Sequence, residues 1–358
     1  MKLPSLGIGV YLNVSQVQME LSVQQAAEIG MRYIFTSLHL PEQSSVNLRR
    51  RLSKLAELTR GYGLQLIADI GPATLSYLQC ANLLAVRDLE LDFARIDYGF
   101  SVQEIAEYSC YSPILLNAST LDELYLEKLR QENTQFEHIA ACHNFYPKPY
   151  SGLSRDYVLK QNKLCHQYGL QTMAFIAGDA EKREPIQSGL PTVETMRLQK
   201  PLLSLLQLWQ ETETNQVIIG DGALSDGSWQ ACKELLQNQL KIEVQLHAGQ
   251  EQWFYLRQQE RQDSSPYVIR SVTSRNYAEK GTTIEANCAG WQRPLGSICL
   301  ANRYYERYSG ELEIARTALP ADPRQNMIGQ VAEESLYLLP YIQHGMGFML
   351  VPEGEGKY

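Results

Sequence analysis

A recurring junction constrains the fold of this chain more than any other feature: a helical stretch ends in glycine, and an apolar strand begins within a few residues. Glycine is the usual residue after a helix because it enters the left-handed backbone region without steric penalty. Repeated junctions of this kind are typical of a parallel sheet whose strands alternate with helices. The junctions are Gly30 before Tyr33–Thr36, Gly63 before Leu64–Asp69 and Gly169 before Leu170–Phe175.

Eight apolar runs in the first two thirds of the chain predict strands. Eight strand–helix units match the usual size of a TIM barrel, which is about 250 residues. The alternative is an open doubly wound sheet, which usually has fewer strands and a glycine-rich turn after the first one. No such turn follows the first run, so we predict the barrel. The runs are Leu6–Leu12, Tyr33–Ser37, Leu64–Asp69, Phe93–Asp97, Ile114–Asn117, His138–Cys142, Leu170–Ile176 and Gln216–Ile219.

Segments with one apolar face lie between these strands. In the stretch from Leu48 to Tyr62, the apolar residues Leu48, Leu52 and Leu55 recur at helical spacing, with Arg and Lys on the other side. This spacing predicts a helix with one buried stripe. The predicted helices are Val23–Gly30, Leu48–Tyr62, Val102–Tyr108, Leu121–Gln131, Tyr157–Tyr168 and Trp229–Leu240.

The pattern changes near residue 240, where short strand-like runs separated by turn residues replace the alternation. Such runs are typical of a small β barrel or sandwich. We therefore predict an α/β fold of two domains: a TIM-barrel catalytic domain over residues 1–240 and a small all-β domain over residues 241–358. Examples of these runs are Ile242–Leu246, Trp253–Leu256, Tyr267–Val272, Thr282–Ala286, Ser297–Leu300, Gly310–Ile314 and Met346–Val351.

The composition argues against several classes of partner and location. Of the 358 residues, 44% are hydrophobic and 20% charged, and the net charge of −8 argues against nucleic acid as a partner. The N-terminus lacks the apolar core of a signal peptide, and no apolar run approaches the roughly 20 residues that span a bilayer. The seven cysteines are scattered without a CxxC pair. We therefore expect free thiols and a cytoplasmic location.

Carboxylates stand at the ends of several predicted strands, which is where a TIM barrel places its active site. Asp69, Asp97 and Asp221 each end or closely follow an apolar run, and Glu194 lies in the long segment after the seventh strand. Any one aspartate could simply cap the following helix. Gathered at one barrel mouth, the four predict acid and base catalysis, because crowding and partial burial let carboxyl groups take separate roles.

The stretch His143–Ser154 follows the sixth strand and concentrates aromatic and hydrogen-bonding side chains between prolines. Prolines stiffen such a loop, and a rigid loop at a strand end is a candidate binding segment. The alternative is an ordinary turn whose tyrosines pack on the surface. The predicted substrate-binding residues at the strand ends are His143, Asn144, Tyr146, Asn117 and Tyr11.

Motifs for metal or nucleophilic catalysis are absent from the sequence, which has no HExxH, no clustered Cys/His set and no GxSxG. We therefore predict no metal and no cofactor. The remaining carboxylates, amides and aromatic rings suit a carbohydrate site, where carboxyl groups act on the glycosidic oxygen and amides bind sugar hydroxyls.

Arginines follow strands of the predicted second domain. Arg270 and Arg275 flank a Ser/Thr-containing turn, and Arg303 follows another strand. The guanidinium fork matches phosphate oxygens, so the three form a candidate phosphate or carboxylate clamp. The alternative is a set of solvated arginines that pair with surface acids.

Several stretches together resemble the 6-phospho-N-acetylmuramidase family, and the resemblance covers essentially the whole chain. The most specific are His143-Asn144-Phe145-Tyr146-Pro147 and Gly189-Leu190-Pro191-Thr192-Val193-Glu194. The others are Leu6-Gly7-Ile8, Ile34-Phe35-Thr36-Ser37-Leu38, Asp97-Tyr98-Gly99, Asn117-Ala118-Ser119-Thr120, Arg303-Tyr304-Tyr305-Glu306-Arg307-Tyr308-Ser309-Gly310-Glu311-Leu312 and Leu319-Pro320-Ala321-Asp322-Pro323-Arg324-Gln325-Asn326.

This resemblance implies a TIM barrel followed by a cyclophilin-like β domain. It also implies a cytoplasmic hydrolase of cell-wall recycling that separates N-acetylmuramic acid 6-phosphate from N-acetylglucosamine. The expected partner is thus a phosphorylated amino-sugar disaccharide. The phosphate and lactyl carboxylate of that disaccharide would suit the arginines of the second domain.

Our leading hypothesis is a glycosidase in which Asp97 acts directly, with Asp221 or Asp69 as its partner. Two other classes stay open: a sugar-phosphate binding module without turnover, and a sugar-phosphate lyase or isomerase on the same barrel. The sequence leaves open which carboxyl group is the acid, whether the reaction retains or inverts configuration, and what the oligomeric state is.

Overall fold

The computed structural model describes residues 2–38, 45–277, 284–287 and 292–356. Within it the chain forms two compact units, one of residues 4–229 and one of residues 230–358 together with residues 1–3. The units part inside helix α8 (Asp226–Leu236). The predicted domain boundary after residue 240 stays a prediction.

The first unit is a closed barrel of eight parallel strands, which confirms the predicted TIM barrel. Each strand pairs with the next along the chain, and β8 pairs with β1 to close the ring. Parallel strands are buried on both faces, so they appear in the sequence as continuous apolar runs. The strands are β1 (Ser5–Gly9), β2 (Tyr33–Thr36), β3 (Gln65–Ile70), β4 (Phe93–Ile96), β5 (Ile114–Asn117), β6 (Ile139–Cys142), β7 (Thr172–Ile176) and β8 (Gln216–Ile219).

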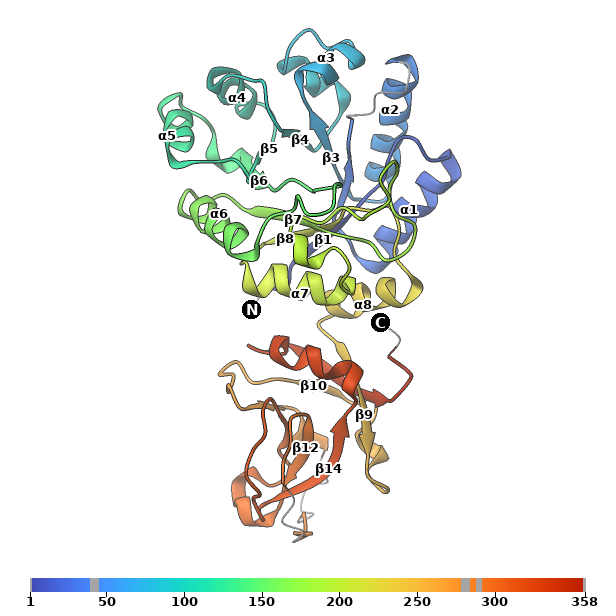
Figure 1. Ribbon diagram of the computed structural model, residues 1–358, viewed down its shortest axis with the longest axis vertical. Coiled ribbons are helices and arrows are strands. Elements are labelled where there is room, and N and C mark those ends of the chain that lie inside the picture. Colours follow the sequence, from blue (N-terminus) through green and yellow to red (C-terminus); the bar gives the residue numbers. More distant parts are fainter. Residues whose placement is uncertain (1, 39–44, 278–283, 288–291, 357–358) are drawn as a thin grey trace. The chain divides into compact units, whose positions relative to one another are not determined.

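Helices lie outside the barrel strands (Figure 1). The predicted helix-ending glycines Gly30, Gly63 and Gly169 have φ angles of 90°, 71° and 77°, so each occupies the left-handed region that favours glycine. The α-helices are α1 (Gln16–Ile29), α2 (Ser45–Gly61), α3 (Pro72–Leu78), α4 (Val102–Ser109), α5 (Glu123–Gln131), α6 (Arg155–Gln167), α7 (Pro201–Glu211) and α8, and the 3₁₀ helices are η1 (Leu84–Leu89), η2 (Phe136–His138) and η3 (Glu194–Met196).

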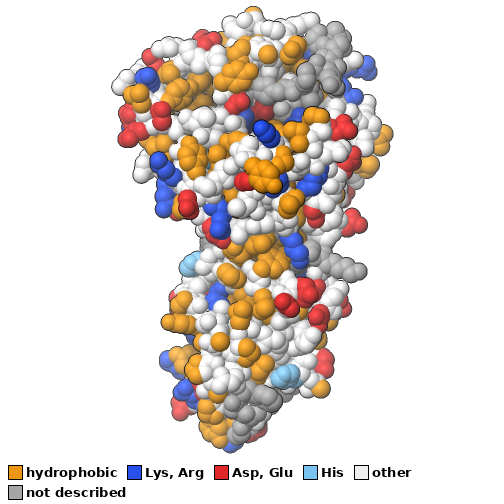
Figure 2. Space-filling view, viewed as in Figure 1, with side chains coloured by type: hydrophobic (Ala, Val, Ile, Leu, Met, Phe, Trp, Pro, Cys, Tyr) orange, Lys and Arg blue, Asp and Glu red, His pale blue; other side chains and the backbone are white. Residues whose placement is uncertain are grey.

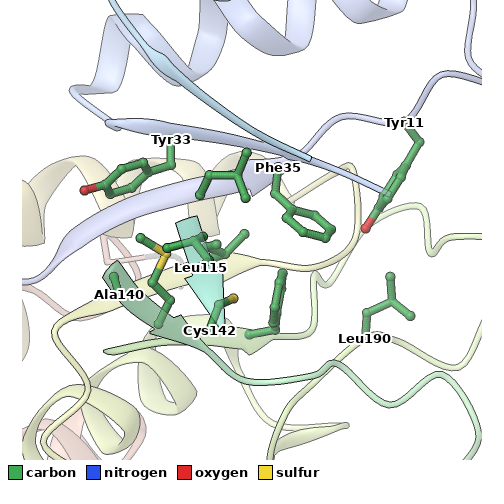
Figure 3. Packing of buried hydrophobic residues seen from close by; sticks show 11 residues of the cluster. Tyr11, Tyr33, Phe35, Leu115, Ala140, Cys142 and Leu190 are labelled. Atoms are coloured by element: carbon green, nitrogen blue, oxygen red, sulfur yellow. The ribbon is translucent and has the colours of Figure 1, made fainter. Parts of the chain in front are cut away.

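Apolar side chains from alternate strand positions fill the barrel interior (Figure 3). Phe35 of β2, Ile67 of β3, Leu115 of β5 and Phe175 of β7 are fully buried. Phe35 and Phe175 meet edge to face with their ring centroids 4.9 Å apart. Because successive side chains alternate between the two faces of a strand, the next inward positions toward the carboxyl ends lie above this apolar layer. The layer therefore forms the floor of the barrel mouth.

The second unit is built on a seven-stranded sheet, which confirms the predicted mostly β domain. Its strands occur in the order β10-β15-β9-β14-β12-β13-β11, and all pairs are antiparallel except that of β9 and β15. The strands are β9 (Leu240–Leu246), β10 (Arg257–Gln259), β11 (Val268–Arg270), β12 (Ser297–Ala301), β13 (Leu312–Ala315), β14 (Gln325–Val331) and β15 (Gly347–Pro352). The helices are α9 (Ser274–Tyr277), η4 (Glu251–Trp253), η5 (Arg303–Tyr308) and η6 (Glu333–Tyr341).

One strand prediction in this unit is wrong, and one strand was not predicted. The run Trp253–Leu256 is not a strand, since Trp253 ends η4 and Tyr255 has a φ of 60°, which interrupts extended backbone. The strand begins at Arg257 instead. Strand β14 was not predicted, because amide side chains interrupt its apolar residues. The predicted run Thr282–Ala286 lies partly outside the described residues.

Acidic and basic side chains are interspersed on the face of each unit that Figure 2 shows. In the described part of the chain, no helix is both long and apolar enough to cross a membrane. No disulfide joins the six cysteines within the described ranges.

Candidate active site

Polar side chains replace the apolar ones at the inward positions nearest the carboxyl ends of three adjacent strands, β3, β4 and β5. Asp69 comes two residues after the buried Ile67, and Arg95 comes two residues after Phe93, which packs against the same core. Asp97 and Asn117 continue the same alternation on β4 and β5. Strand geometry thus brings two carboxylates, a guanidinium and an amide to one side of the barrel mouth.

Arg95 and Asp69 form a buried ion pair across neighbouring strands. Their Cα atoms are partners in the β3–β4 pairing, and Arg95 Nη1 lies 2.8 Å from Asp69 Oδ1. Each residue is 3% exposed. Burial opposes the charge on Arg95, but the Asp69 carboxylate outweighs it and raises the guanidinium pKa above its usual value. The pair therefore carries opposite charges deep in the mouth.

Arg95 also fixes the start of the segment that follows β6. Its Nη2 donates hydrogen bonds to the backbone oxygens of Cys142 and His143, both at 3.3 Å, and to Oδ1 of Asn144. Charge-assisted bonds of this kind are stronger and more directional than neutral ones. Asn144 is thereby held at the edge of the same polar cluster.

Asp97 differs from Asp69 in having spare hydrogen-bonding capacity. It is half-buried, and Nδ2 of Asn117 donates to its Oδ1 at 2.7 Å. The Asn117 amide is oriented in turn by the backbone N–H of Ser119, which donates to Asn117 Oδ1 at 3.0 Å. Within the described residues, no other hydrogen bond to the Asp97 carboxylate is formed. An ionised carboxylate has about four acceptor positions, so Asp97 can still receive a ligand proton or hydroxyl group.

A cavity of about 380 Å³ opens over this cluster. Its floor includes Asp69, Arg95 and Asp97, and its rim is formed by two loops. Volumes of this order are typical of small-molecule sites. The full lining consists of Ser37, Asp69, Arg95, Asp97, Asn144, Phe145, Pro147, Arg183, Glu184, Pro185, Ile186, Gln187, Ser188, Gly189 and Leu190.

The two loops that carry the most specific sequence motifs are joined by hydrogen bonds. The backbone N–H groups of Tyr146 and Leu153 donate to the oxygens of Pro191 and Thr192, each at 2.9 Å. Thr192 Oγ1 donates to the backbone oxygen of Asn144 at 2.8 Å. The second loop braces the first through these hydrogen bonds. Together they form a rigid wall of the cavity.

Glu194 holds this wall together. Its carboxylate accepts the backbone N–H groups of Tyr150 (2.8 Å) and Gly152 (2.7 Å), and Nε and Nη2 of Arg197 at 2.7 and 2.6 Å. The Arg197 contact and the two backbone donors lower the Glu194 pKa to about 2. Its acceptor positions are thus occupied by the protein, and it does not line the cavity.

Asp221 is also fully engaged within the protein. It is 0% exposed and accepts three backbone hydrogen bonds, from Gly178 (2.9 Å), Arg183 (3.0 Å) and Leu190 (3.1 Å). These donors lie near the start, in the interior and near the end of the loop between β7 and η3. Asp221 therefore anchors the loop that forms the cavity rim, without lining the cavity.

His143 points away from the cavity because side chains alternate between the two faces of the strand. Its neighbours Cys142 and Asn144 point inward, so His143 points outward. It is 0% exposed, with Nε2 2.9 Å from Asn162 Oδ1 of helix α6 and Nδ1 3.2 Å from Ser119 Oγ. Burial lowers the pKa of His143 to about 4, so the imidazole is neutral at pH 7. In this structure its two nitrogens tie β6 to α6 and to the segment after β5.

The two tyrosines of the predicted set occupy different surroundings. Tyr11 is 3% exposed, its hydroxyl donates to the Gly220 oxygen, and burial raises its pKa. The Arg183 guanidinium carbon lies 3.8 Å from the centre of the Tyr11 ring. Tyr146 is half-buried and does not line the 380 Å³ cavity.

Two family models match adjacent parts of the chain and together span residues 6–351. The model described as 6-phospho-N-acetylmuramidase, N-terminal, matches residues 6–253, and the corresponding C-terminal model matches residues 238–351. The chain belongs to the 6-phospho-N-acetylmuramidase family.

Two solved structures are similar to this chain over almost its whole length. A conserved protein of unknown function from Enterococcus faecalis is 28% identical, with a TM-score of 0.78, and the match covers 99% of this chain and 98% of that one. An uncharacterised B. cereus protein is 25% identical, with a TM-score of 0.75, and the match covers 98% and 100%. No curated protein matches this chain. The match to each of these two structures therefore spans both units of this chain.

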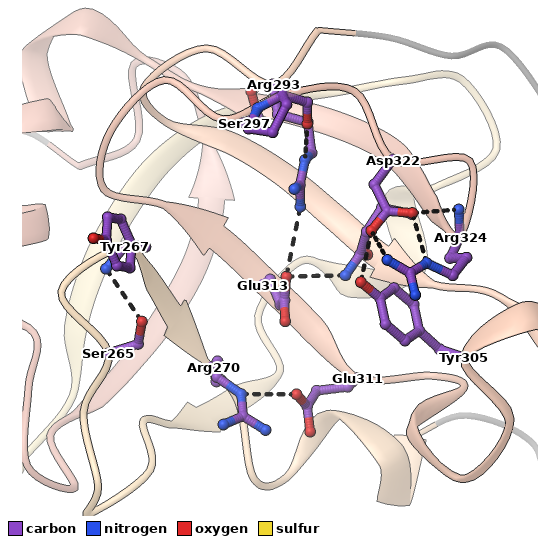
Figure 4. Close-up of polar contacts among 12 residues, drawn as sticks. Ser265, Tyr267, Arg270, Arg293, Ser297, Tyr305, Glu311, Glu313, Asp322 and Arg324 are labelled. Carbon is purple, nitrogen blue, oxygen red and sulfur yellow. Dashed lines mark hydrogen bonds and ion pairs between the residues drawn. The ribbon is translucent and has the colours of Figure 1, made fainter.

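The arginines predicted as a clamp lie in the second unit of this family member. Arg270 Nε pairs with Glu311 Oε1 at 2.9 Å, within a set of polar contacts on the sheet (Figure 4). Arg303 pairs with Glu285 at 2.8 Å, and Arg275 is exposed. Two of the three guanidinium groups therefore already face carboxylates within their own unit. Their role in substrate binding stays a prediction.

Sequence reasoning missed Arg95, although the signal was present. The predicted strand Phe93–Asp97 contains one charged residue between apolar neighbours, and its parity places it inward between Phe93 and Asp97. Buried charges are retained only with a partner, so an arginine there should have prompted a search for a carboxylate on an adjacent strand.

Among the described residues, no group of three or more His, Cys, Asp or Glu side chains is arranged to hold a metal ion.

Proposed function

We propose that this family member is a cytoplasmic glycosidase of cell-wall recycling, which hydrolyses the bond between 6-phospho-N-acetylmuramic acid and N-acetylglucosamine. The observation that carries the proposal is Asp97, a half-buried carboxylate with spare acceptor capacity on the floor of a 380 Å³ cavity. The family assignment supplies the substrate class.

Asp97 takes the direct catalytic role and Asp69 is its partner. Both line the cavity, whereas Asp221 and Glu194 are engaged by protein donors outside its lining. Glycoside hydrolysis proceeds through a positively charged, oxocarbenium-like sugar. Two carboxylates facing one guanidinium favour the positive charge that develops on the sugar ring in this transition state over the uncharged ring of the ground state.

Arg95 and Asn117 are positioning residues in this scheme. Arg95 holds Asp69 at 2.8 Å, and Asn117 holds Asp97 at 2.7 Å. Fixed side chains of this kind lower the cost of reaching a reactive geometry. Asn144 and Ser37, which line the same cavity, are placed to bind sugar hydroxyl groups.

The test is the release of N-acetylglucosamine from the phosphorylated disaccharide. Asp97→Asn preserves the shape and the acceptor for Asn117, so it should fold normally and lose about 10³- to 10⁴-fold in kcat. Asp88→Asn changes an exposed aspartate outside the cavity and should retain wild-type turnover.

Two outcomes would overturn the proposal. Binding of the disaccharide without cleavage by the wild-type protein would indicate a binding module. Near-normal turnover by a well-folded Asp97→Asn variant would remove Asp97 from the chemistry.

A further inference from the structure

A second cavity adjoins the first, and the two share Arg183 and Glu184. The second cavity has a volume of about 450 Å³ and lies between the end of β1, helix α1 and the loop after β7. Asn13, Gln18 and Gln25 contribute uncharged polar groups to it. Arg183 therefore lies at the boundary between the two cavities. A residue at this place could contact a ligand with one sugar ring in each cavity.

Arg183 is held in place by the protein on three sides. Its backbone N–H donates to Asp221 Oδ1 at 3.0 Å. Its guanidinium carbon lies 3.8 Å from the Tyr11 ring centre and 5.8 Å from that of Phe145. Stacking on aromatic faces leaves the edge N–H groups of a guanidinium available for a ligand.

Among the described residues the Arg183 guanidinium has no ion-pair partner, and only the backbone N–H of Arg183 is bonded to the buried Asp221 carboxylate. Among the ion pairs formed by the described residues, none includes Arg183, whereas the other arginine of the first cavity, Arg95, is paired with Asp69. The adjacent Glu184 is exposed, so solvent screens its charge, while Arg183 is partly buried. A preorganised, unpaired guanidinium at a cavity wall is suited to an anionic ligand group.

We propose that Arg183 binds an anionic group of the substrate, either a sugar phosphate or a lactyl carboxylate, where the two cavities meet. This inference rests on the proposed function for the identity of the sugar. It assigns the selectivity for a charged sugar to the barrel unit itself, through a residue that touches substrate but takes no part in bond cleavage.

Binding measurements test this without requiring turnover. Calorimetry would use three sugars. N-acetylmuramic acid 6-phosphate carries both anions, N-acetylmuramic acid carries the carboxylate alone, and N-acetylglucosamine 6-phosphate carries the phosphate alone. Arg183→Ala should weaken the binding of N-acetylmuramic acid 6-phosphate by roughly 10- to 100-fold, the usual contribution of a charge-assisted contact. Arg183→Lys should recover part of the loss, because it restores the charge without the fork.

The single-anion ligands identify the group that Arg183 binds. If, of the two single-anion sugars, only N-acetylglucosamine 6-phosphate loses affinity, Arg183 binds the phosphate. If only N-acetylmuramic acid loses affinity, Arg183 binds the carboxylate. Arg87→Ala is the matched control, since Arg87 is an exposed arginine stacked 4.7 Å from the Tyr111 ring, outside both cavities.

Turnover separates failure of this inference from failure of the proposed function. For the phosphorylated disaccharide, kcat/KM should fall in Arg183→Ala by a factor similar to the loss in binding. If Arg183→Ala, folded by circular dichroism, binds all three sugars within about twofold of wild type, the inference is wrong even if the disaccharide is cleaved. It is equally wrong if the wild-type protein binds none of them. Selective binding through Arg183 without any cleavage would overturn only the proposed glycosidase.

Discussion

Asp97 and Asp221 follow strands of the same barrel, yet their surroundings differ in kind. Asp97 is half-buried with one side-chain donor, and it lies on the floor of a cavity. Asp221 is fully buried and accepts three backbone N–H groups. A carboxylate whose acceptor positions are all taken by backbone N–H groups stabilises the fold, whereas one with unused acceptor positions can contact a substrate. Counting carboxylates at strand ends does not separate these two roles.

Glu194 and Asp69 extend the comparison. Glu194 resembles Asp221, since four protein donors occupy it, and it joins the two loops of the cavity wall. Asp69 is intermediate: it lines the cavity but is paired with Arg95. Variants of the two anchoring carboxylates should therefore act mainly on stability, in contrast to Asp97.

The largest stability effect should come from Asp221→Ala. The change leaves the buried N–H groups of Gly178, Arg183 and Leu190 without their acceptor, and each unsatisfied group costs about 1–3 kcal/mol. Urea unfolding should show a loss of about 3–5 kcal/mol, together with lower activity because the cavity rim is released. Asp88→Ala, at an exposed position, is the control and should change the unfolding free energy by less than about 0.5 kcal/mol. An equally small effect for Asp221→Ala would break the comparison.

The next effect is a pH dependence caused by His143. Its folded pKa of about 4 lies below the usual 6.5, so between these values the unfolded chain binds a proton that the native protein does not. Stability should be full above pH 6.5 and fall by about 3 kcal/mol as the pH drops to 4. His143→Gln should be less stable at pH 7 and should lose this slope. Parallel pH profiles for the two proteins would show that another group is responsible.

Glu194→Gln should give the smallest of the three losses. The neutral amide weakens the bidentate contact with Arg197 and the two backbone bonds, at a cost of about 2 kcal/mol at pH 7. Because the folded pKa of Glu194 is lowered to about 2, its contribution is present above about pH 4.5 and is lost as the pH falls toward 2. The difference between variant and wild type should shrink over that window. A constant difference would mean that lost packing, not lost charge, causes the effect.

His143 shows why the sequence pointed to a segment that lines the cavity without separating its inward residues from its outward ones. The composition of His143–Ser154 marked a binding segment, and Asn144, Phe145 and Pro147 do line the cavity. Parity along the strand, which the composition does not display, turns His143 outward to Asn162 of α6. Applying the period-two rule from Ile67 and Phe93 would have placed Asp69, Arg95 and Asp97 inside, and the same rule from Ala140 would have placed His143 outside.

The sequence alone determined the barrel, the mostly β second unit and the family, because glycine-ended helices and continuous apolar strands are local patterns that persist in the fold. Only the tertiary structure decided which carboxylates are free. Asp221 meets donors from positions 178, 183 and 190, and Glu194 meets donors from positions 150, 152 and 197. These partners are fixed by how the loops close over the barrel. No local pattern of residues encodes that closure.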